Sequence, residues 1–168
     1  MSQPSPLSRI RRYRWLYALG AIVFLADQAT KSWVFAQIPF NTFGPPGHIE
    51  IIPGFFNIVH VGNTGAAWSM FAGNSMPLAF LAGITLIAIF FFRRHLVLGH
   101  PTVQTCFGLL CGGILGNLVD RLVHGHVVDF LDFRFGSYIY PTFNIADSGI
   151  VIGVLLYLIV SFRTPAET

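Results

Sequence analysis

Two aspartates stand in sequence contexts that could support acid–base chemistry. Asp129 follows two valines and precedes a phenylalanine, with no adjacent cation, so loss of water is expected to raise its pKa. Asp147 lies in the run Phe-Asn-Ile-Ala-Asp, where an apolar stretch begins. Two carboxyl groups held together in a partly dry site share one proton. Such a pair could hydrolyse an amide without a metal, because one member draws a proton from water while the other polarises the carbonyl.

The spacing around Asp147 also fits a structural role. Asn144 is a good helix N-cap and Asp147 would then stand at N3, so helix capping is the favoured interpretation from spacing alone. Asp27 and Lys31 are four residues apart and are expected to form a structural pair on one helix face. Asp120 precedes Arg121, whose charge would keep this acid ionised if the two side chains meet.

Other hydrolytic chemistries find little support. The sequence contains neither Gly-x-Ser-x-Gly nor His-Glu-x-x-His. Cys106 and Cys111 would lie on different sides of a helix, and both are expected to be small buried residues. His124 and His126 could face one way from a strand, but two histidines do not make a zinc site, so no metal is expected.

The composition points to a protein of the lipid bilayer. Of 168 residues, 54% are apolar and only 10% are charged, against roughly 25% charged in soluble domains. Length fits one domain, residues 1–168, and the net charge of +3 gives no reason to expect nucleic-acid binding. About 17 to 25 mostly apolar residues are needed to cross the hydrocarbon. Four stretches are expected to do so, at about 15–36, 76–92, 103–118 and 145–162.

Charges divide between the two ends of these stretches. If the spans alternate, one side holds Arg9, Arg11, Arg12, Arg14, Arg93, Arg94 and Arg163, and the other holds Lys31, Arg121 and Arg134. This bias predicts that both termini are cytoplasmic. The outer side carries the acids Asp27, Glu50, Asp120, Asp129, Asp132 and Asp147, whereas Glu167 lies inside, which suggests a chemical site on the outer face. A cleavable signal over residues 15–26 is the alternative for the first span, but three further spans make an uncleaved helix simpler. Residues 1–8 are expected to form a disordered tail.

The segment between the first two spans, residues 37–75, is too rich in Pro and Gly to cross the membrane. Strand-like runs at 48–52 and 55–61 predict a hairpin or small curved sheet. Its aromatic residues, with Trp68 and Phe71 nearby, suggest either an interfacial belt or a platform for an extended substrate. In the third span, Gly108, Gly112 and Gly116 would let a neighbouring helix approach closely and so support the polar residues that follow.

Five motifs occur in the order found in a known family. They are Asp27-Gln28-x-x-Lys31, Asn63-x-Gly65-Ala66-Ala67-Trp68, Gly116-Asn117-x-x-Asp120-Arg121, Val127-Val128-Asp129-Phe130 and Phe143-Asn144-x-Ala146-Asp147. Together, over about residues 15–162, the chain closely resembles bacterial lipoprotein signal peptidase, also called signal peptidase II. Trp68 stands where Phe is frequent, which affects no catalytic position.

The resemblance implies an all-α membrane protein of four transmembrane helices, with a small periplasmic β-hairpin or curved sheet between the first two. It implies an inner-membrane aspartyl endopeptidase, without cofactor, that removes the signal peptide from diacylglyceryl-modified prolipoproteins just before the lipidated cysteine. The catalytic pair falls on Asp129 and Asp147. The substrate-binding positions are Asn63, Asn117, Arg121 and Asn144, and the supporting positions are Asp27, Lys31, Gly65 and Asp120. The expected partners are the lipidated precursor and the bilayer, with the enzyme as a monomer and its site near the periplasmic face.

Two other classes remain open from the residues alone. Acidic and basic residues within spans also mark ion pathways, as in a proton-coupled transporter. Against this, the ionisable residues gather toward one face and do not continue through the second span. A purely structural membrane subunit would leave the outward acids unexplained.

Overall fold

The structure is a computed structural model, and it describes residues 11–65, 73–93, 95–96 and 98–163. The expected N-terminal tail lies outside these ranges. So do Arg9, Trp68, Phe71, Arg94 and Glu167.

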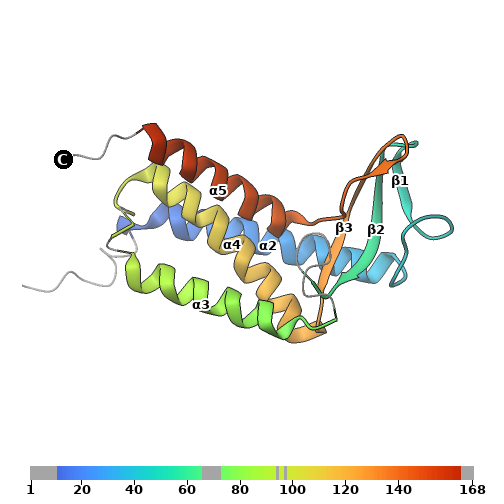
Figure 1. Cartoon of the computed structure of the whole chain (residues 1–168), viewed down its shortest axis with the longest axis horizontal. Coiled ribbons are helices and arrows are strands. Elements are labelled where there is room, and N and C mark those ends of the chain that lie inside the picture. The colour runs from blue at the N-terminus through green and yellow to red at the C-terminus, as the bar shows by residue number, and fades with distance from the viewer. Residues whose placement is uncertain (1–10, 66–72, 94, 97, 164–168) are drawn as a thin grey trace, which may run out of the picture.

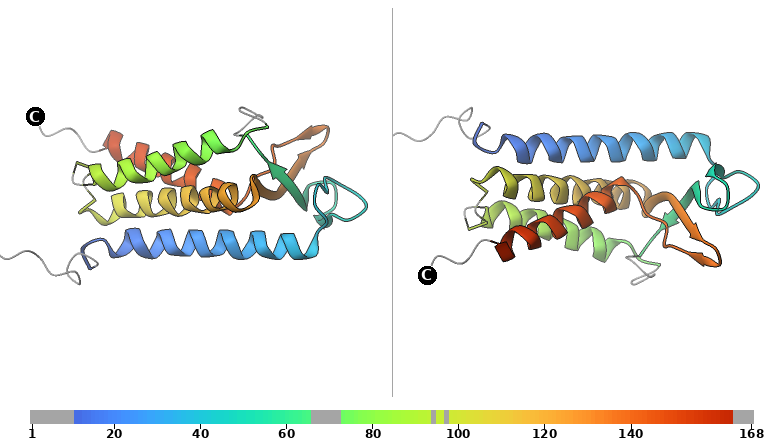
Figure 2. Two further views of the ribbon diagram at one scale, coloured as in Figure 1. Left: turned by 90° about the horizontal axis from the view of Figure 1, so that it is seen from below. Right: turned by 90° about the horizontal axis from the view of Figure 1, so that it is seen from above.

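Four helices form the body of the molecule: α2 (Arg14–Gln37), α3 (Met76–Phe92), α4 (Pro101–His124) and α5 (Ile145–Arg163). In Figures 1 and 2, α2, α3 and α4 run side by side, and α5 slopes across the bundle. The chain reverses direction from each helix to the next. The start of α2 and the end of α5 therefore lie at one end of the bundle, and the β-structure lies at the other.

The third helix is longer than the predicted span. The prediction ended it at Leu118, before the charges of Asp120 and Arg121, but α4 continues to His124 and ends at Gly125. Gly125 has a φ of 75°, the left-handed conformation that commonly closes a helix. The helix passes through the charged residues because both find polar partners inside the protein, as described below.

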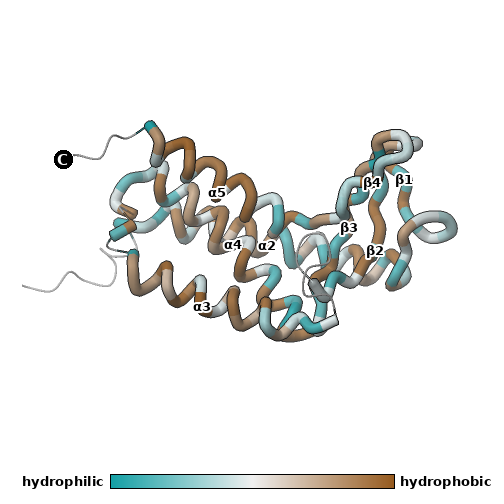
Figure 3. The backbone as a smooth tube through the Cα atoms, viewed as in Figure 1, coloured by the Kyte–Doolittle hydropathy of each residue, from teal (hydrophilic) through white to brown (hydrophobic). Residues whose placement is uncertain are grey.

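The helices present apolar side chains to their surroundings. Among the described helices, α4 and α5 are long and apolar enough to cross a membrane, and α3 is a shorter apolar helix. Only Ala79 is buried in α3, whereas Phe80 and Phe91 are largely exposed. Figure 3 shows hydrophobic residues along α3 and α5. An apolar surface of this extent suits lipid better than water.

Glycines let α4 pack closely against two neighbours, as predicted for the Gly108 stripe. A Cβ added at Gly112 would lie 2.5 Å from the Gly20 carbonyl oxygen of α2. On another face of α4, a Cβ at Gly113 would lie 2.3 Å from the Ala146 carbonyl oxygen of α5. Since neither separation is possible for a real Cβ, α4 holds α2 and the first turn of α5 at backbone contact distance.

The β-structure is larger than the predicted hairpin. Four antiparallel strands follow the order β1 (Ile49–Ile52), β2 (Phe56–Asn63), β3 (Val127–Phe135) and β4 (Tyr138–Ile139). Helices with a small antiparallel sheet, including the β1–β2 pairing, are confirmed, but the sheet is not confined to the segment between the first two helices as expected. The segment between α4 and α5 supplies two more strands. The two residues between β3 and β4, Gly136 and Ser137, are a hairpin turn signal that the sequence analysis did not use, and Gly136 has a φ of 63°. The pairing of β3 with the distant β2 could not be predicted from this signal.

Two apolar clusters hold the ends of the bundle. Val34 and Ile38 of α2 are buried against Val128 and Phe130 of β3, which ties the sheet to the helices. At the opposite end, Leu98, Val103 and Phe107 form a second cluster. Burial of each such side chain contributes about 1.5–3 kcal/mol. The first cluster therefore anchors the strand that carries Asp129.

Candidate active site

Asp129 lies in β3 and is held by two asparagine side chains. Its side chain is 2% exposed. Asn63 Nδ2 donates to Asp129 Oδ2 at 2.9 Å, and Asn144 Nδ2 donates to Oδ1 at 2.7 Å. Asn63 stands opposite Val127 in the β2–β3 register, two residues from Asp129 and so on the same face of the sheet. The pairing of β2 with β3 therefore aims the Asn63 amide at this carboxyl group.

Asp147 lies in the first turn of α5, where the predicted cap is formed. The Asp147 N–H donates to Asn144 Oδ1 at 2.9 Å, and the Asn144 N–H donates to Asp147 Oδ2 at 3.2 Å. The other carboxyl oxygen, Oδ1, accepts from Asn117 Nδ2 at 2.7 Å. Asp147 therefore takes part in the helix cap and also belongs to the polar site. The cap fixes the direction in which the carboxyl group points.

Asn144 joins the two aspartates, because its side chain bonds Asp129 and its backbone and side chain bond Asp147. Burial raises the pKa of Asp129 to about 7, and the negative charge of nearby Asp147 adds to the increase. The predicted effect of desolvation on Asp129 is confirmed. Two carboxyl groups so placed titrate as a coupled pair.

Arg121 connects α4 to the chain that follows β2. Its Nη1 donates to the Asn117 carbonyl oxygen at 3.3 Å, and its Nη2 donates to the Gly65 carbonyl oxygen at 3.1 Å. The Gly65 N–H in turn donates to Asn63 Oδ1 at 2.9 Å, which leaves the Asn63 amide nitrogen free to face Asp129. Arg121 Nε is buried and has no hydrogen-bond partner among the described residues. This nitrogen is a donor available to a ligand.

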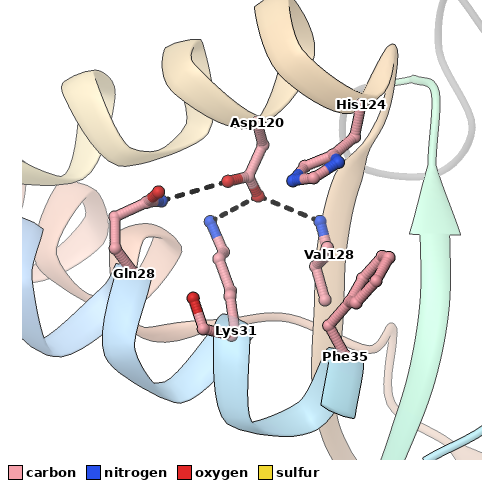
Figure 4. Close-up of a pocket in the computed structure, with 7 residues that line it drawn as sticks. Gln28, Lys31, Phe35, Asp120, His124 and Val128 are labelled. Atoms are coloured by element: carbon pink, nitrogen blue, oxygen red, sulfur yellow. Dashed lines mark hydrogen bonds and ion pairs between the residues drawn. The ribbon is translucent and has the colours of Figure 1, made fainter.

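Asp120 pairs with Lys31, and the expected contact with Arg121 is absent from the described hydrogen bonds and ion pairs. Lys31 Nζ lies 2.8 Å from Asp120 Oδ2 and 2.8 Å from Asp27 Oδ2, so the predicted Asp27–Lys31 pair is confirmed and extended. Gln28 Nε2 donates to Asp120 Oδ1 at 3.0 Å, and the Val128 N–H donates to Asp120 Oδ2 at 3.1 Å. Figure 4 shows these groups converging on Asp120 from α2 and β3.

A cavity of about 170 Å³ lies beside this cluster, lined by Gln28, Lys31, Ser32, Phe35, Asp120, His124 and Val128. Neither Asp129 nor Asp147 lines it. The ammonium of Lys31 and both carboxyl oxygens of Asp120 already have protein partners. The cavity is therefore separate from the paired aspartates.

All ten predicted site residues belong to one connected polar cluster. Hydrogen bonds and ion pairs join Asp27, Lys31, Asn63, Gly65, Asn117, Asp120, Arg121, Asp129, Asn144 and Asp147. The sequence analysis missed the bridging role of Gln28, which bonds Asp120 across a separation of 92 residues. Its place next to Asp27 was the only sequence signal, and adjacency does not reveal a distant partner.

The histidines and cysteines lie apart from the aspartates. His124 and His126 are not on one strand, because His124 lies in the last turn of α4 and His126 precedes β3. Across the described part of the chain, no three His, Cys, Asp or Glu side chains are arranged to hold a metal ion. Both cysteines are free, but only Cys106 is buried, and Cys111 is half-buried. The prediction of two buried cysteines is therefore right for Cys106 alone.

The fold and the site fit one class of protein: a helical membrane protein whose polar end holds two neighbouring buried carboxyl groups, as in aspartic peptidases. Comparison with known proteins supports this assignment. A family model described as Signal peptidase (SPase) II matches residues 19–163. The chain belongs to the signal peptidase II family, the bacterial membrane proteases that process lipoprotein precursors.

Individual relatives agree over nearly the whole chain. The lipoprotein signal peptidase of Nostoc punctiforme is 42% identical over 163 residues, which cover 94% of each chain. That of Nitratidesulfovibrio vulgaris is 37% identical over 159 residues, covering 92% of this chain and 93% of the relative. A solved structure described as a bacterial membrane enzyme is 33% identical, with a TM-score of 0.80 over 91% of this chain and 90% of the other. A second one with the same description is 34% identical, with a TM-score of 0.74 over 91% and 94%.

Proposed function

We propose that this chain cleaves the signal peptide from diacylglyceryl-modified prolipoproteins just before the lipidated cysteine, and that Asp129 and Asp147 are its catalytic pair. The observation that carries the assignment is the link through Asn144, which bonds both carboxyl groups. One residue thereby sets the position of each acid relative to the other. Within the described cluster, Asp147 is the only acid that shares a neutral hydrogen-bond partner with Asp129.

The mechanism needs one proton on the pair and one water. The ionised member takes a proton from the water, and the resulting hydroxide forms a bond to the scissile carbonyl carbon while the protonated member hydrogen-bonds the carbonyl oxygen. The tetrahedral species then collapses, the C–N bond breaks, and the leaving amine takes a proton from the pair. Asn63, Asn117 and Asn144 supply neutral donors that hold the carboxyl oxygens without adding a positive charge. Burial and the mutual charge of the two acids raise the pKa of Asp129 to about 7 in spite of these donors, so the pair can keep a shared proton near neutral pH.

Arg121, Asn63, Asn117 and Asn144 would orient the peptide. The buried Nε of Arg121 faces no described partner and is suited to a backbone carbonyl of an extended substrate. Its two other bonds hold it between α4 and Gly65. Asp27, Lys31 and Asp120 support this arrangement from behind, and Gly65 positions Asn63.

The proposed setting is the bacterial inner membrane, with residues 1–168 as one monomeric domain that needs no cofactor and binds no nucleic acid. All four helices would span the bilayer. In support, α2 has 24 residues, about 36 Å at 1.5 Å per residue, and α3, which packs on the other side of α4, has an apolar surface (Figure 2). Both termini would be cytoplasmic and the sheet periplasmic. A substrate anchored by acyl chains in the outer leaflet would then reach the aspartates near the periplasmic face.

Cleavage by the purified protein in lipid tests this proposal. The wild type is expected to cut a lipidated precursor and to leave the unlipidated one intact. Asp129→Asn and Asp147→Asn should each lose about 10²–10⁴-fold in rate, the usual contribution of an acid–base group. Asp132→Asn is a matched control, since Asp132 is also buried in β3 but bonds Asn57 and Arg134 outside the cluster.

Asp132→Asn is expected to retain near wild-type activity. Full activity in a folded Asp129→Asn or Asp147→Asn protein would refute the catalytic assignment. Equal cleavage of both precursors would refute the substrate assignment and leave the catalytic pair standing.

A further inference from the structure

Lys31 uses all its hydrogen-bonding capacity inside the protein. The ammonium group has three hydrogens and no acceptor. Its Nζ lies 2.8 Å from Asp27 Oδ2, 2.8 Å from Asp120 Oδ2 and 2.9 Å from Asn117 Oδ1. The side chain is 4% exposed. Two of these contacts are ion pairs, but the third is with a neutral amide, and a simple structural pair with Asp27 does not require it.

That third contact determines which way the Asn117 carboxamide faces. Asn117 Oδ1 receives Lys31 Nζ and, at 3.3 Å, Asn144 Nδ2. Asn117 Nδ2 is directed to Asp147 Oδ1 at 2.7 Å. If the amide turned over, its NH₂ would meet two donors and its oxygen would meet a carboxylate. Both contacts would be repulsive, so the orientation seen is the one that satisfies every group.

Lys31 has no described hydrogen bond or ion pair with Asp147, although its positive charge acts on that acid through space. Its single charge already faces the two carboxylates of Asp27 and Asp120, so this trio is formally one charge negative. The other charged groups around Asp147 are Arg121 of α4, Asp129 of β3 and Asp27 of α2. The path from Lys31 to Asp147 by hydrogen bonds therefore runs through one amide.

We infer that Lys31 is a positioning residue for the reaction: by fixing the Asn117 carboxamide, it keeps the amide NH₂ on Asp147 Oδ1. This inference rests on the proposed catalytic pair. A hydrogen bond donated to a carboxylate favours the ionised form, so the donor helps the pair to retain one ionised member. Lys31 acts at a distance from the substrate, through its hydrogen bond to Asn117 and in addition to the direct effect of its charge on Asp147.

The test begins with Lys31→Met, which keeps an unbranched apolar stem and removes the donor. The turnover number is expected to fall about 100-fold, as small misplacements at a reacting group do, with KM nearly unchanged. The acid limb of the pH–rate profile should move upward by about one pH unit, because the pair takes up its second proton more readily. Gln28→Met is the matched control. Gln28 bonds Asp27 and Asp120 but forms no described hydrogen bond to Asn117, so its replacement should lower thermal stability without moving the acid limb.

A double-mutant cycle with Asn117→Ala separates positioning from a general loss of structure. If Lys31 acts through Asn117, Lys31→Met will have little further effect on turnover once Asn117 is Ala. Equal losses from Lys31→Met in the presence and absence of Asn117 would overturn the inference, as would an unmoved acid limb. If Lys31→Met alone does not accumulate in membranes, the same cycle with Asn117→Ala is run in an Asp27→Asn protein. In that background, loss of the Lys31 cation is matched by loss of one of the two carboxylates that it contacts.

The two proposals fail in different ways. Activity in a folded Asp129→Asn protein would refute the catalytic pair. Additive losses in the cycle, with Asp129→Asn inactive, would refute the role of Lys31 and leave the pair intact.

Discussion

At the scale of single residues, the aspartates are held by neutral donors. Asn63 and Asn144 bond Asp129, and Asn117 bonds Asp147. A cation at 2.8 Å would strongly favour ionisation of both acids, whereas amides fix geometry and leave a proton to be shared. Lys31 forms its ion pairs with two other acids, Asp27 and Asp120, and the described hydrogen bonds of Arg121 are to carbonyl oxygens. Direct ion pairs therefore distinguish Asp27 and Asp120 from Asp129 and Asp147, which lie within the field of the same cations.

The pH dependence of cleavage follows from this arrangement. Because burial raises the pKa of Asp129 to about 7, kcat/KM should fall as pH rises through about 7 and the pair loses its shared proton. The measurement is a pH–rate profile on a lipidated precursor in fixed lipid. A rate that stays constant from pH 6 to pH 9 would contradict the shared proton.

The free energy of unfolding should also depend on the protonation of Asp129. The unfolded chain releases the Asp129 proton near 3.8 and the native protein near 7, so between these values the native state binds more protons. The stability contributed by protonated Asp129 is full below 3.8 and is lost as pH rises toward 7. The melting temperature of the wild type should therefore decrease relative to that of Asp129→Asn from pH 4 to pH 7, and level off above it.

At the scale of elements, α4 brings the site together. Its glycines admit α2 on one face and α5 on another, and its last turns carry Asn117, Asp120 and Arg121. The start of α5 is placed by two contacts: the Ala146 carbonyl packs on Gly113, and the Ala146 N–H donates to Asp27 Oδ1 at 2.9 Å. The distance between β3 and α5, and so between the two acids, depends on this close packing.

Gly113→Ala tests that dependence. The added Cβ would lie 2.3 Å from the Ala146 carbonyl oxygen, so the first turn of α5 must move and carry Asp147 with it. We expect a loss of about 1–3 kcal/mol in stability, the usual cost of overpacking, and at least a tenfold loss of cleavage rate. Thermal melting and the precursor assay measure the two effects.

Gly83→Ala in α3 is the control, since nothing lies within 4 Å of a Cβ at Gly83. It should keep full activity, because the added methyl group meets open space. If Gly113→Ala matched Gly83→Ala in both assays, close packing of α4 on α5 would not be what positions Asp147.

At the scale of the whole molecule, the polar groups gather where the helices meet the sheet. Two loops that are distant in sequence, before α3 and before α5, pair through β2 and β3 and cover this end of the bundle (Figure 1). The opposite end carries the C-terminal end of α5 and the link between α3 and α4. An asymmetric molecule of this kind can present its site at one membrane face only.

The proposed orientation can be measured with single cysteines, after Cys106 and Cys111 are replaced by Ala. The two substitutions are Ser137→Cys and His95→Cys. Ser137 lies in the exposed turn between β3 and β4, and His95 lies in the exposed link between α3 and α4. An impermeant maleimide should label Ser137→Cys in intact spheroplasts and His95→Cys only after lysis. The reverse pattern would place the site on the cytoplasmic side and refute the proposed topology.

Local features of the chain could be read without the structure. The apolar stretches predicted the four helices, and short-range rules found the Asp27–Lys31 pair and the Asn144 cap. Each depends on residues three or four apart, or on the apolar content of about 20 consecutive residues, which the backbone geometry of a helix converts directly into contacts. The choice of Asp129 and Asp147 came from family resemblance, because spacing alone favoured capping for Asp147.

The tertiary structure decided which distant groups meet. The Asn63–Asp129 bond spans 66 residues and exists because β2 pairs with β3, a strand that the sequence did not reveal. Asp120 had an arginine beside it, yet it pairs with Lys31, 89 positions away by residue number, because α2 lies against α4. Local rules act over one helical turn or one hairpin. Partners across the bundle depend on how closely the helices approach, and here glycines at the α4 surface set that distance.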